Sequence, residues 1–253
     1  MEGLSLQVVL RTERKDCFAL LAMTRSILRE DSRDIHSFHH SLLDQTFVER
    51  LFITGIGTDV GKTVVAAILT EALHADYWKP VQAGLTPATD TDTVRGLVRN
   101  TVSRFWPERY RLRLPASPHA AAAAEGLELR PGDFQLPETT NHLLVEGAGG
   151  LLVPLAPGFL MADLVRQLNL AVVVVSRNYL GSINHTLLTL EALRARGLRV
   201  RGLVFNGEPT PATEDFIARH SGVPLLPRLR PEPEISADLV SRYAAEFRPW
   251  FAR

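Results

Sequence analysis

The stretch RLFITGIGTDVGKTVVAAILTEAL, residues 50–73, constrains the fold more than any other part of the chain. An apolar run is followed by a glycine-containing turn and then by a run with helical character. A turn of this kind presents backbone N–H groups to an anion, with the positive end of the helix behind them. Lys62 and Thr63 follow Gly61 as in a phosphate-binding loop, where the lysine contacts phosphate and the hydroxyl binds Mg²⁺. The motif therefore predicts nucleotide binding.

The loop is one residue longer than the standard pattern. That pattern has four residues between its first glycine and the Gly-Lys pair, whereas five residues separate Gly55 from Gly61 here. ATPases that partition membranes and chromosomes carry an additional lysine near the start of the loop, and the matching residue here is Gly57. The missing lysine argues against that class.

The rest of the chain alternates short apolar runs with helical stretches. Runs that are apolar on both faces are typical of a parallel sheet covered by helices. We therefore expect a doubly wound, mostly parallel α/β domain with helices on both faces, of the P-loop NTPase type. The expected strands are residues 50–54, 76–80, 142–147, 170–176, 200–206 and 223–227, and the expected helices are 62–74, 91–100, 160–168, 183–196, 211–221 and 236–247. Loops are marked by Pro115, Pro118, Pro131, Pro137 and the run 227–234.

Composition excludes several classes of protein. Lys+Arg and Asp+Glu are both 28, so the formal net charge is zero, which argues against a protein that wraps nucleic acid. No apolar run reaches the roughly 18 residues that a membrane span needs. The one cysteine, Cys17, excludes a disulfide framework and indicates a reducing compartment, the cytoplasm.

Residues 1–49 differ from the rest of the chain. They mix charges with short apolar patches, and only residues 17–30 have the spacing of a helix. Three histidines in HSFHH, residues 36–40, lack supporting cysteines or carboxylates and are therefore expected to be solvated. We expect this segment to be a poorly ordered, dispensable extension or a start-site artefact, and residues 50–253 to form the domain.

Three further segments carry candidate polar residues. Lys79, in YWKPVQAG, follows a short strand at the end where ligands bind in open parallel sheets. Glu146 ends an apolar strand and is followed by glycines that let a ligand approach, which suits a Mg²⁺ ligand. In TDTDTVRGL, Asp90 or Asp92 opens a helix, and either carboxylate could simply cap that helix.

Six segments, taken in order, resemble the dethiobiotin synthetase family. They are TGIGTDVGKT, YWKPVQAG, DTDTV, VEGAGGLLVPL, YLGSINHTLLT and LVFNGE. The resemblance runs from Arg50 to the C-terminus, and the family also has the lengthened glycine loop. It implies an ATP- and Mg²⁺-dependent cyclo-ligase of biotin biosynthesis. One amine of 7,8-diaminopelargonate would react with CO₂ to give a carbamate, and ATP would phosphorylate that carbamate. The second amine would then close the ring of dethiobiotin and release phosphate, with ADP as the other product.

The resemblance also implies roles for individual residues. Lys79, Lys62 and Thr58 match catalytic positions, and Thr63, Asp92 and Glu146 match the metal ligands. The matches to nucleotide-binding positions are Asp59, Val60, Gly61, Lys62, Thr63, Val64, Asp92, Glu146, Gly147, Ala148, Gly149, Asn206, Gly207, Pro227, Arg228, Leu229 and Glu234. The matches to substrate-binding positions are Thr58, Lys79, Ala83, Gly149, Gly181, Ser182 and Asn184. In the family the last three come from the neighbouring subunit, which implies a homodimer, and Ser182 could equally cap its own helix.

One departure and two alternatives bear on this interpretation. The family often has Ser or Thr where Ala83 stands, so either the backbone or Gln82 replaces that contact or the contact is absent. A related amide-forming P-loop ligase usually carries a glutamine amidotransferase domain with a nucleophilic cysteine, and no cysteine follows Arg50. A partition-type ATPase is disfavoured by the missing loop lysine and by Lys79.

Overall fold

The computed structural model describes residues 48–252. The predictions for Cys17, for a helix at 17–30 and for the histidines at 36–40 lie outside these residues. No helix in the described part is long and apolar enough to cross a membrane.

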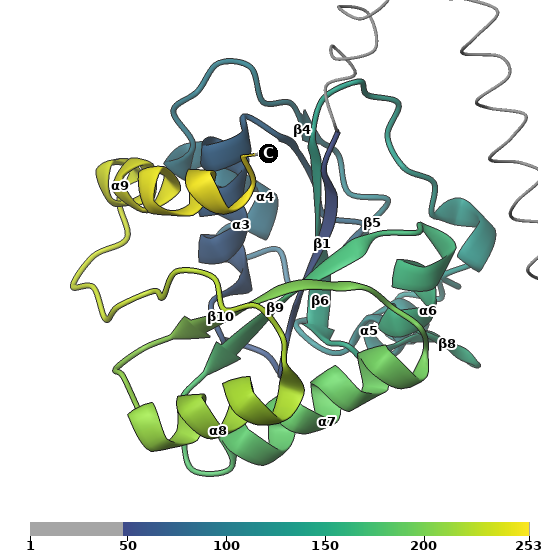
Figure 1. Ribbon diagram of the computed structural model, residues 1–253. Helices are drawn as coiled ribbons and strands as arrows, with labels where there is room; N and C mark the ends of the chain where they lie inside the picture. The colour runs from purple at the N-terminus through teal and green to yellow at the C-terminus, as the bar shows by residue number, and fades with distance from the viewer. Residues whose placement is uncertain (1–47, 253) are drawn as a thin grey trace, which may run out of the picture. The chain divides into compact units, whose positions relative to one another are not determined.

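A six-stranded sheet forms the centre of the described part, in the order β10-β9-β1-β6-β2-β4 (Figure 1). Its strands are β1 (Arg50–Gly55), β2 (Asp76–Trp78), β4 (Phe105–Trp106), β6 (Leu143–Gly150), β9 (Ala171–Arg177) and β10 (Val200–Asn206). All neighbouring strands pair in parallel. The predicted parallel sheet is therefore confirmed, and the carboxyl ends of its strands share one edge.

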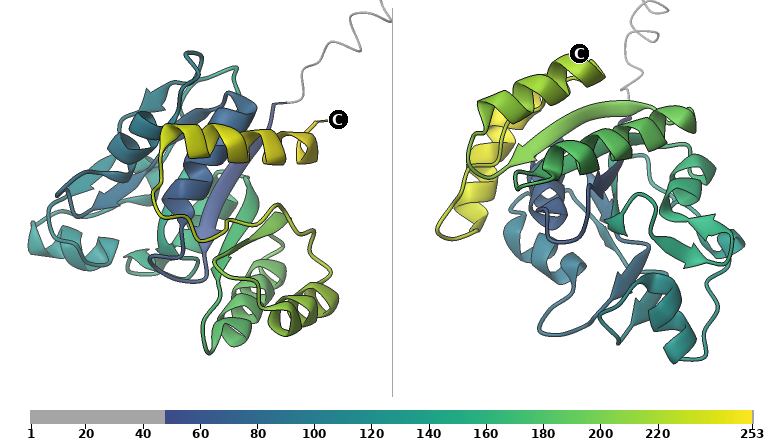
Figure 2. Two further views of the ribbon diagram at one scale, coloured as in Figure 1. Left: turned by 90° about the vertical axis from the view of Figure 1, so that its left-hand side faces the viewer. Right: turned by 90° about the horizontal axis from the view of Figure 1, so that it is seen from below.

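Helices cover both faces of this sheet, as predicted (Figures 1 and 2). Leu51 and Ile53 of β1 pack on one face in a cluster with α3 and α9, whereas Phe52 points to the other face. The helices are α3 (Lys62–Leu73), α4 (Asp90–Leu97), α5 (Pro118–Ala124), α6 (Met161–Gln167), α7 (Ser182–Ala195), α8 (Pro211–Ser221) and α9 (Ala237–Phe247). Short 3₁₀ turns span Pro131–Asp133 and Arg248–Trp250.

Two small sheets flank the main one. The strands β3 (Val81–Ala83) and β5 (Tyr110–Leu112) pair in parallel, and β7 (Pro154–Ala156) pairs with β8 (Phe159–Leu160) in the antiparallel sense. The expected strand 76–80 thus ends at Trp78, and the chain changes sheet after Pro80. That change of direction leaves Lys79 between the two sheets.

Two predictions for proline-containing segments are wrong. The expected strand 223–227 makes only an isolated bridge between Leu203 and Leu225, because Pro224 and Pro227 have no N–H to give to a ladder. Pro118, expected in a loop, is the first residue of α5. A proline is favoured there because the first N–H groups of a helix have no partner within the helix.

Backbone pairing extends to Glu49, the residue before β1. The N–H of Glu49 donates to Nδ1 of His142 at 2.8 Å, and the carbonyl of Glu49 accepts from the N–H of Leu143 at 2.9 Å. The side chain of Glu49 is buried and forms an ion pair with Arg201 at 3.5 Å. Glu49 therefore belongs to the folded part and not to the expected extension.

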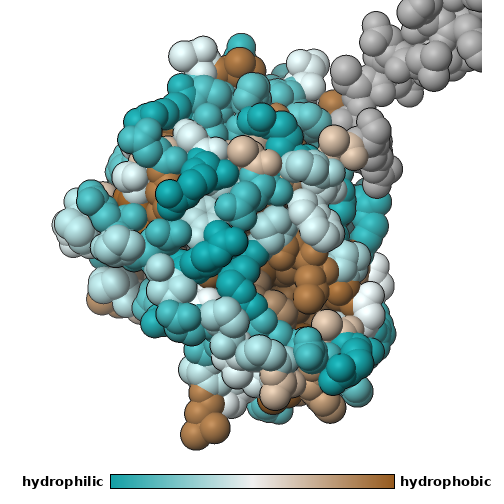
Figure 3. Space-filling view, turned by 60° about the vertical axis from the view of Figure 1, so that its left-hand side comes forward, coloured by the Kyte–Doolittle hydropathy of each residue, from teal (hydrophilic) through white to brown (hydrophobic). Residues whose placement is uncertain are grey.

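The surface mixes charged and apolar side chains. Figure 3 shows a mostly hydrophilic face on which hydrophobic residues gather in one patch. Large hydrophobic side chains are also exposed around the start of α7, where Leu180, Ile183 and Leu188 are 103%, 37% and 54% exposed. Isolated exposed hydrophobic residues are normal, but a group on one helix needs an account.

The edge strand β4 is attached to the sheet through the carboxylate of Asp76. This side chain is 1% exposed. Its Oδ1 accepts hydrogen bonds from the N–H of Arg104 and from Nδ2 of Asn141 at 3.0 and 3.1 Å, and its Oδ2 accepts from Nε1 of Trp106 at 3.1 Å. Both oxygens must therefore be acceptors.

We predict that Asp76→Asn lowers the free energy of unfolding by about 1–3 kcal/mol, because an amide NH₂ would face a buried donor. Urea unfolding measures the change. The matched control is Asp215→Asn on the exposed side of α8, where a change within about 0.5 kcal/mol is expected. Equal stability of the two variants would contradict the role given to Asp76.

Candidate active site

A cavity of about 850 Å³ lies at the carboxyl edge of the sheet. It opens where the chain leaves β1, β2 and β6, which is where ligands bind in open parallel sheets. Eleven of the predicted site residues line it: Thr58, Asp59, Gly61, Lys62, Thr63, Val64, Lys79, Ala83, Glu146, Ala148 and Gly149. The structure therefore brings the phosphate-binding loop together with the segments around Lys79 and Glu146.

The phosphate-binding loop ends at an uncapped helix. Gly61 precedes α3 with a φ of 98°, and no side chain caps the first N–H groups of that helix. A Cβ on Gly61 would lie 2.4 Å from Nδ2 of Asn206, so both the backbone and the space require glycine. The free N–H groups and the helix dipole are suited to an anion.

Lys62 is the first residue of α3 and is almost fully buried. Its ammonium donates to the carbonyl of Gly57 at 2.9 Å, across the widened turn of the loop. Burial lowers the pKa of Lys62, and the positive charge of Lys79 lowers it further, against the pull of Glu146. Lys62 therefore loses its proton more readily than a free lysine, and the nearby carboxylates oppose that loss.

Glu146 lies at the centre of the site and is 1% exposed. Its Oε1 accepts from the hydroxyl of Thr63 at 2.9 Å and from the ammonium of Lys79 at 3.2 Å. Its Oε2 accepts from the hydroxyl of Tyr77 at 2.8 Å. Three donors from separate segments thus stabilise the ionised carboxylate at a buried position.

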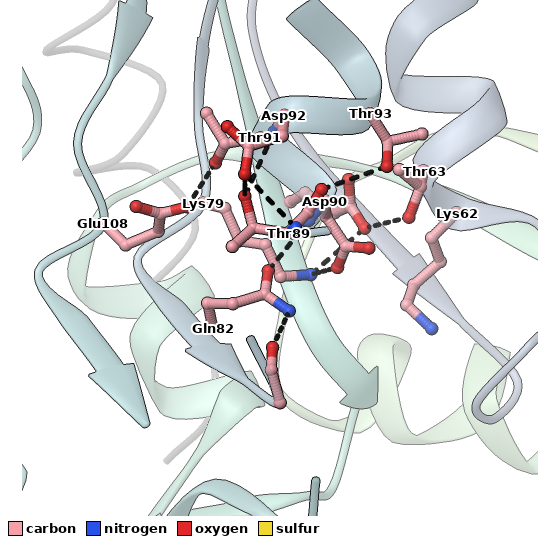
Figure 4. A network of polar contacts seen from close by, with 12 residues as sticks. Lys62, Thr63, Lys79, Gln82, Thr89, Asp90, Thr91, Asp92, Thr93 and Glu108 are labelled. Carbon is pink, nitrogen blue, oxygen red and sulfur yellow. Dashed lines mark hydrogen bonds and ion pairs between the residues drawn. The ribbon is translucent and has the colours of Figure 1, made fainter. Parts of the chain in front are cut away.

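Lys79 binds a second carboxylate as well. Its ammonium forms an ion pair with Asp90, and the backbone N–H of Asp90 donates to Oε1 of Gln82 at 3.1 Å (Figure 4). Burial by itself lowers the pKa of Lys79, but the charges of Glu146 and Asp90 outweigh burial and raise it above its ordinary value. Lys79 is therefore a buried lysine that stays protonated.

The structure places the predicted site residue Asp92 away from the cavity and a neighbouring aspartate, Asp90, in its lining. Asp92 lies outside the cavity lining, and its side chain is 52% exposed. It forms a capping box with Thr89 at the start of α4 and an ion pair with Arg95 at 3.1 Å (Figure 4). Residues two apart on a helix do not face the same way. Asp90 points to the site, and Asp92 caps the helix.

The oxygen atoms of Thr63, Asp90 and Glu146 form a set that suits Mg²⁺. This ion prefers oxygen ligands and usually takes only one or two carboxylates, the rest coming from phosphate and water. Residues 48–252 contain no cluster of three or more His, Cys, Asp or Glu side chains, which a protein cage for a metal would need. The site therefore fits Mg²⁺ that arrives with a nucleotide.

The residues predicted to contact the nucleotide base lie beside the loop but not in the cavity lining. The side chain of Asn206 donates to the carbonyl of Val60 at 2.8 Å. The backbones of Gly207 and Leu229 are joined by a hydrogen bond of 2.9 Å, and Arg228 is paired with Glu214. Together with Pro227 they flank the end of β10, whereas Glu234 is exposed and lies further along the chain.

Five other predicted residues also lie outside the cavity lining, the first of them Val60, which is buried within the phosphate-binding loop. Gly147 is buried in β6, and a Cβ there would lie 2.8 Å from the ring of Phe52. Ser182 is buried as the first residue of α7, and Gly181 precedes it with a φ of 100°. Asn184 is exposed on the same helix. Within one chain these α7 residues do not reach the cavity.

Several lining residues were not among the predicted site residues. Gln82, Val153 and the segment 115–118 line the cavity together with the predicted residues. Gln82 uses both ends of its amide, accepting from Asp90 and donating to the carbonyl of Gly84 at 3.0 Å. Both ends of the Gln82 amide are therefore engaged within the chain. In the sequence, the segment 115–118 was distinguished only by its prolines. Prolines indicate a loop but do not indicate that the loop binds a ligand.

Comparison with known proteins agrees with this geometry. A family model described as an AAA domain matches residues 49–238. An ATP-dependent dethiobiotin synthetase BioD from Cytophaga hutchinsonii is 49% identical over 206 residues, which are 81% of this chain and 100% of that protein. Another from Christiangramia forsetii is 49% identical over 197 residues, which are 78% of this chain and 95% of that protein.

One solved structure is also similar. The ParA family ATPase from Chlorobium tepidum TLS has a TM-score of 0.49 and 12% identity, over 80% of this chain and 97% of that chain. A likeness at this level bears on no functional question.

Proposed function

The chain belongs to the family of ATP-dependent dethiobiotin synthetases, and from this premise we propose how its cavity carries out the reaction. The enzyme is a ligase of biotin biosynthesis that uses ATP. The observation that carries the proposal is the meeting of the phosphate-binding loop, Lys79 and Glu146 in one cavity of about 850 Å³.

The proposed reaction has three steps. One amine of 7,8-diaminopelargonate adds to CO₂ and loses a proton, which gives a carbamate. A carbamate oxygen then attacks the γ-phosphorus of ATP, and ADP leaves. The second amine attacks the carbonyl carbon of this mixed anhydride, the C–O bond to phosphate breaks, and the ureido ring closes with loss of a proton.

Charge neutralisation is the main task of the protein in the second step. A carbamate and a triphosphate are both anionic, so their approach must be stabilised by cations. Lys79 stays protonated at a buried position and would hold the carbamate. Lys62 and the free N–H groups at the start of α3 would hold the β- and γ-phosphates. Thr58, on the widened turn, would lie between the two anions.

Mg²⁺, when bound, would supply further positive charge between the β- and γ-phosphates. In the proposed ligand set Asp90 takes the place predicted for Asp92, alongside Thr63 and Glu146. Lys79 holds both carboxylates in the structure described here. Mg²⁺ held by these carboxylates would compete with Lys79 for them, and the ammonium of Lys79 would then be available to the carbamate.

The base of ATP is proposed to lie beside the end of β10. Asn206 and the segment 227–229 flank the phosphate-binding loop there. A side-chain amide can donate to and accept from the edge of a base. Because Nδ2 of Asn206 already donates to Val60, base binding would use its second N–H and its oxygen.

The homodimer remains a proposal, and a second groove supports it. This groove has a volume of about 430 Å³, lies between the phosphate-binding loop and α7, and is lined by Leu152 and Leu188 among others. It shares Thr58 with the main cavity. A second copy seated on this apolar surface would bring its own Gly181, Ser182 and Asn184 toward the neighbouring substrate.

The location of the enzyme and the role of the first residues are also proposals. We place the enzyme in the cytoplasm, where ATP is plentiful and a lone thiol stays reduced. We further propose that residues 50–253, with Glu49, carry the whole reaction and that the preceding segment is dispensable for it.

Release of ADP is the first test. The purified protein should release ADP only when it is given ATP, Mg²⁺, bicarbonate and 7,8-diaminopelargonate together, because each takes part in forming the anhydride. A coupled ADP assay with single omissions measures this, and mass spectrometry identifies dethiobiotin. No ADP release with all four present would overturn the proposed function.

The two aspartates of α4 test the metal site. Asp90→Asn should lower kcat/KM by at least about 100-fold and raise the Mg²⁺ concentration for half-maximal activity. Loss of a residue that only hydrogen-bonds to a metal ligand costs about 10–100-fold, and loss of a ligand should cost more. The matched control, Asp92→Asn, should stay within about three-fold and lose at most about 1 kcal/mol of stability as a cap. The reverse ranking would restore Asp92 to the site.

The dimer is tested at the groove. Leu188→Glu should give a monomer in sedimentation velocity and a large rise in KM for 7,8-diaminopelargonate, because it places a charge on the apolar surface. Val102→Glu is the control, since Val102 is 58% exposed and lies outside that groove. A fully active wild-type monomer would refute the shared site.

A further inference from the structure

Tyr77 is a buried tyrosine at the start of the segment YWKPVQAG, and no role was predicted for it. It is the second residue of β2 and is 0% exposed. Its ring packs in the cluster with α3 and lies 6.3 Å from the ring of Phe105, centroid to centroid. A phenylalanine would fill this space equally well. The residue's hydroxyl therefore needs an explanation that packing does not supply.

The hydroxyl of Tyr77 reaches the carboxylate of Glu146. It donates to Oε2 at 2.8 Å, and both groups are buried. A buried hydroxyl usually finds some partner, so satisfaction of Tyr77 alone would explain the contact. The partner of the Tyr77 hydroxyl is nevertheless Glu146, the central carboxylate of the site, and not a backbone carbonyl.

The two oxygens of Glu146 have different neighbours. Oε1 is shared by the hydroxyl of Thr63 and the ammonium of Lys79, both of which line the cavity. Oε2 is held by Tyr77, which lies outside the cavity lining. The phenol thus binds the oxygen that contacts no cavity-lining side chain. This bond opposes rotation of the carboxylate about the Cγ–Cδ bond.

We propose that Tyr77 is a positioning residue, whose hydroxyl fixes the carboxylate of Glu146 so that Oε1 faces the metal and the phosphates. This inference rests on the proposed role of Glu146 as a metal ligand. Carboxylates that bind metals are themselves held by hydrogen bonds, and loss of such a partner costs about 10–100-fold in metal affinity or activity.

Tyr77→Phe tests the proposal, because it removes one oxygen atom and keeps the ring. Binding of Mg²⁺ in the presence of ADP is measured by calorimetry, and the Mg²⁺ dependence of turnover is measured in parallel. The affinity for Mg²⁺ should fall by about 10–100-fold. The value of kcat at saturating Mg²⁺ should stay within a few-fold of the wild type, since no reacting atom is touched.

The matched control is Tyr243→Phe. Tyr243 is 1% exposed, and its hydroxyl donates to a carboxylate too, that of Glu232 at 2.7 Å, in the segment before α9. This variant should also lose stability in urea, because its hydroxyl binds both Glu232 and the N–H of Arg230, and it should keep the wild-type affinity for Mg²⁺. The pair separates the loss of a buried hydrogen bond from the loss of carboxylate positioning.

Each other outcome is decisive. Wild-type Mg²⁺ affinity in Tyr77→Phe would overturn the inference and leave the proposed function intact. A Tyr77→Phe protein that does not fold, beside a folded Tyr243→Phe protein, would also overturn it, because the hydroxyl would then serve folding. If the wild-type protein binds Mg²⁺ with ADP but forms no dethiobiotin, the proposed function fails, and the calorimetric comparison still decides the role of Tyr77.

Discussion

The carboxylate of Glu146 is the interaction on which the rest of the site depends. It lies in the middle of β6, where the parallel register sets it beside Ile53 of β1, just before the phosphate-binding loop. Donors from β2, from the segment after β2 and from α3 converge on its two oxygens. A buried carboxylate is stable only when such donors surround it. The site therefore depends on the sheet order that brings β2, β6 and α3 together, and the buried carboxylate of Glu146 depends on the donors that this order supplies.

Much of the fold and half of the site follow from local sequence. The phosphate-binding loop is contiguous, Glu146 follows an apolar run with the pattern of a strand, and Lys79 follows two aromatic residues. Because parallel strands end at one edge, three local patterns are enough to place these groups together. No knowledge of side-chain direction was needed for those residues.

The errors arise where side-chain direction and pairing decide. Asp90 and Asp92 are equivalent in composition, and only the position of Thr89 as the N-cap assigns one to the cavity and the other to the cap. Tyr77 has the pattern of a core residue, and its partner is distant in sequence. Proline occurs both in loops and at the first position of helices, so Pro118 alone does not reveal that α5 begins there.

The bond between Lys62 and the carbonyl of Gly57 has a consequence for ligand entry. A free lysine side chain loses up to about 2 kcal/mol of rotamer entropy when a ligand orders it. Lys62 has already lost most of that freedom, because its own loop holds the ammonium. An arriving phosphate therefore replaces the carbonyl of Gly57 as the partner of an ammonium that is already ordered. The affinity of the loop for phosphate then reflects the difference between these two hydrogen bonds.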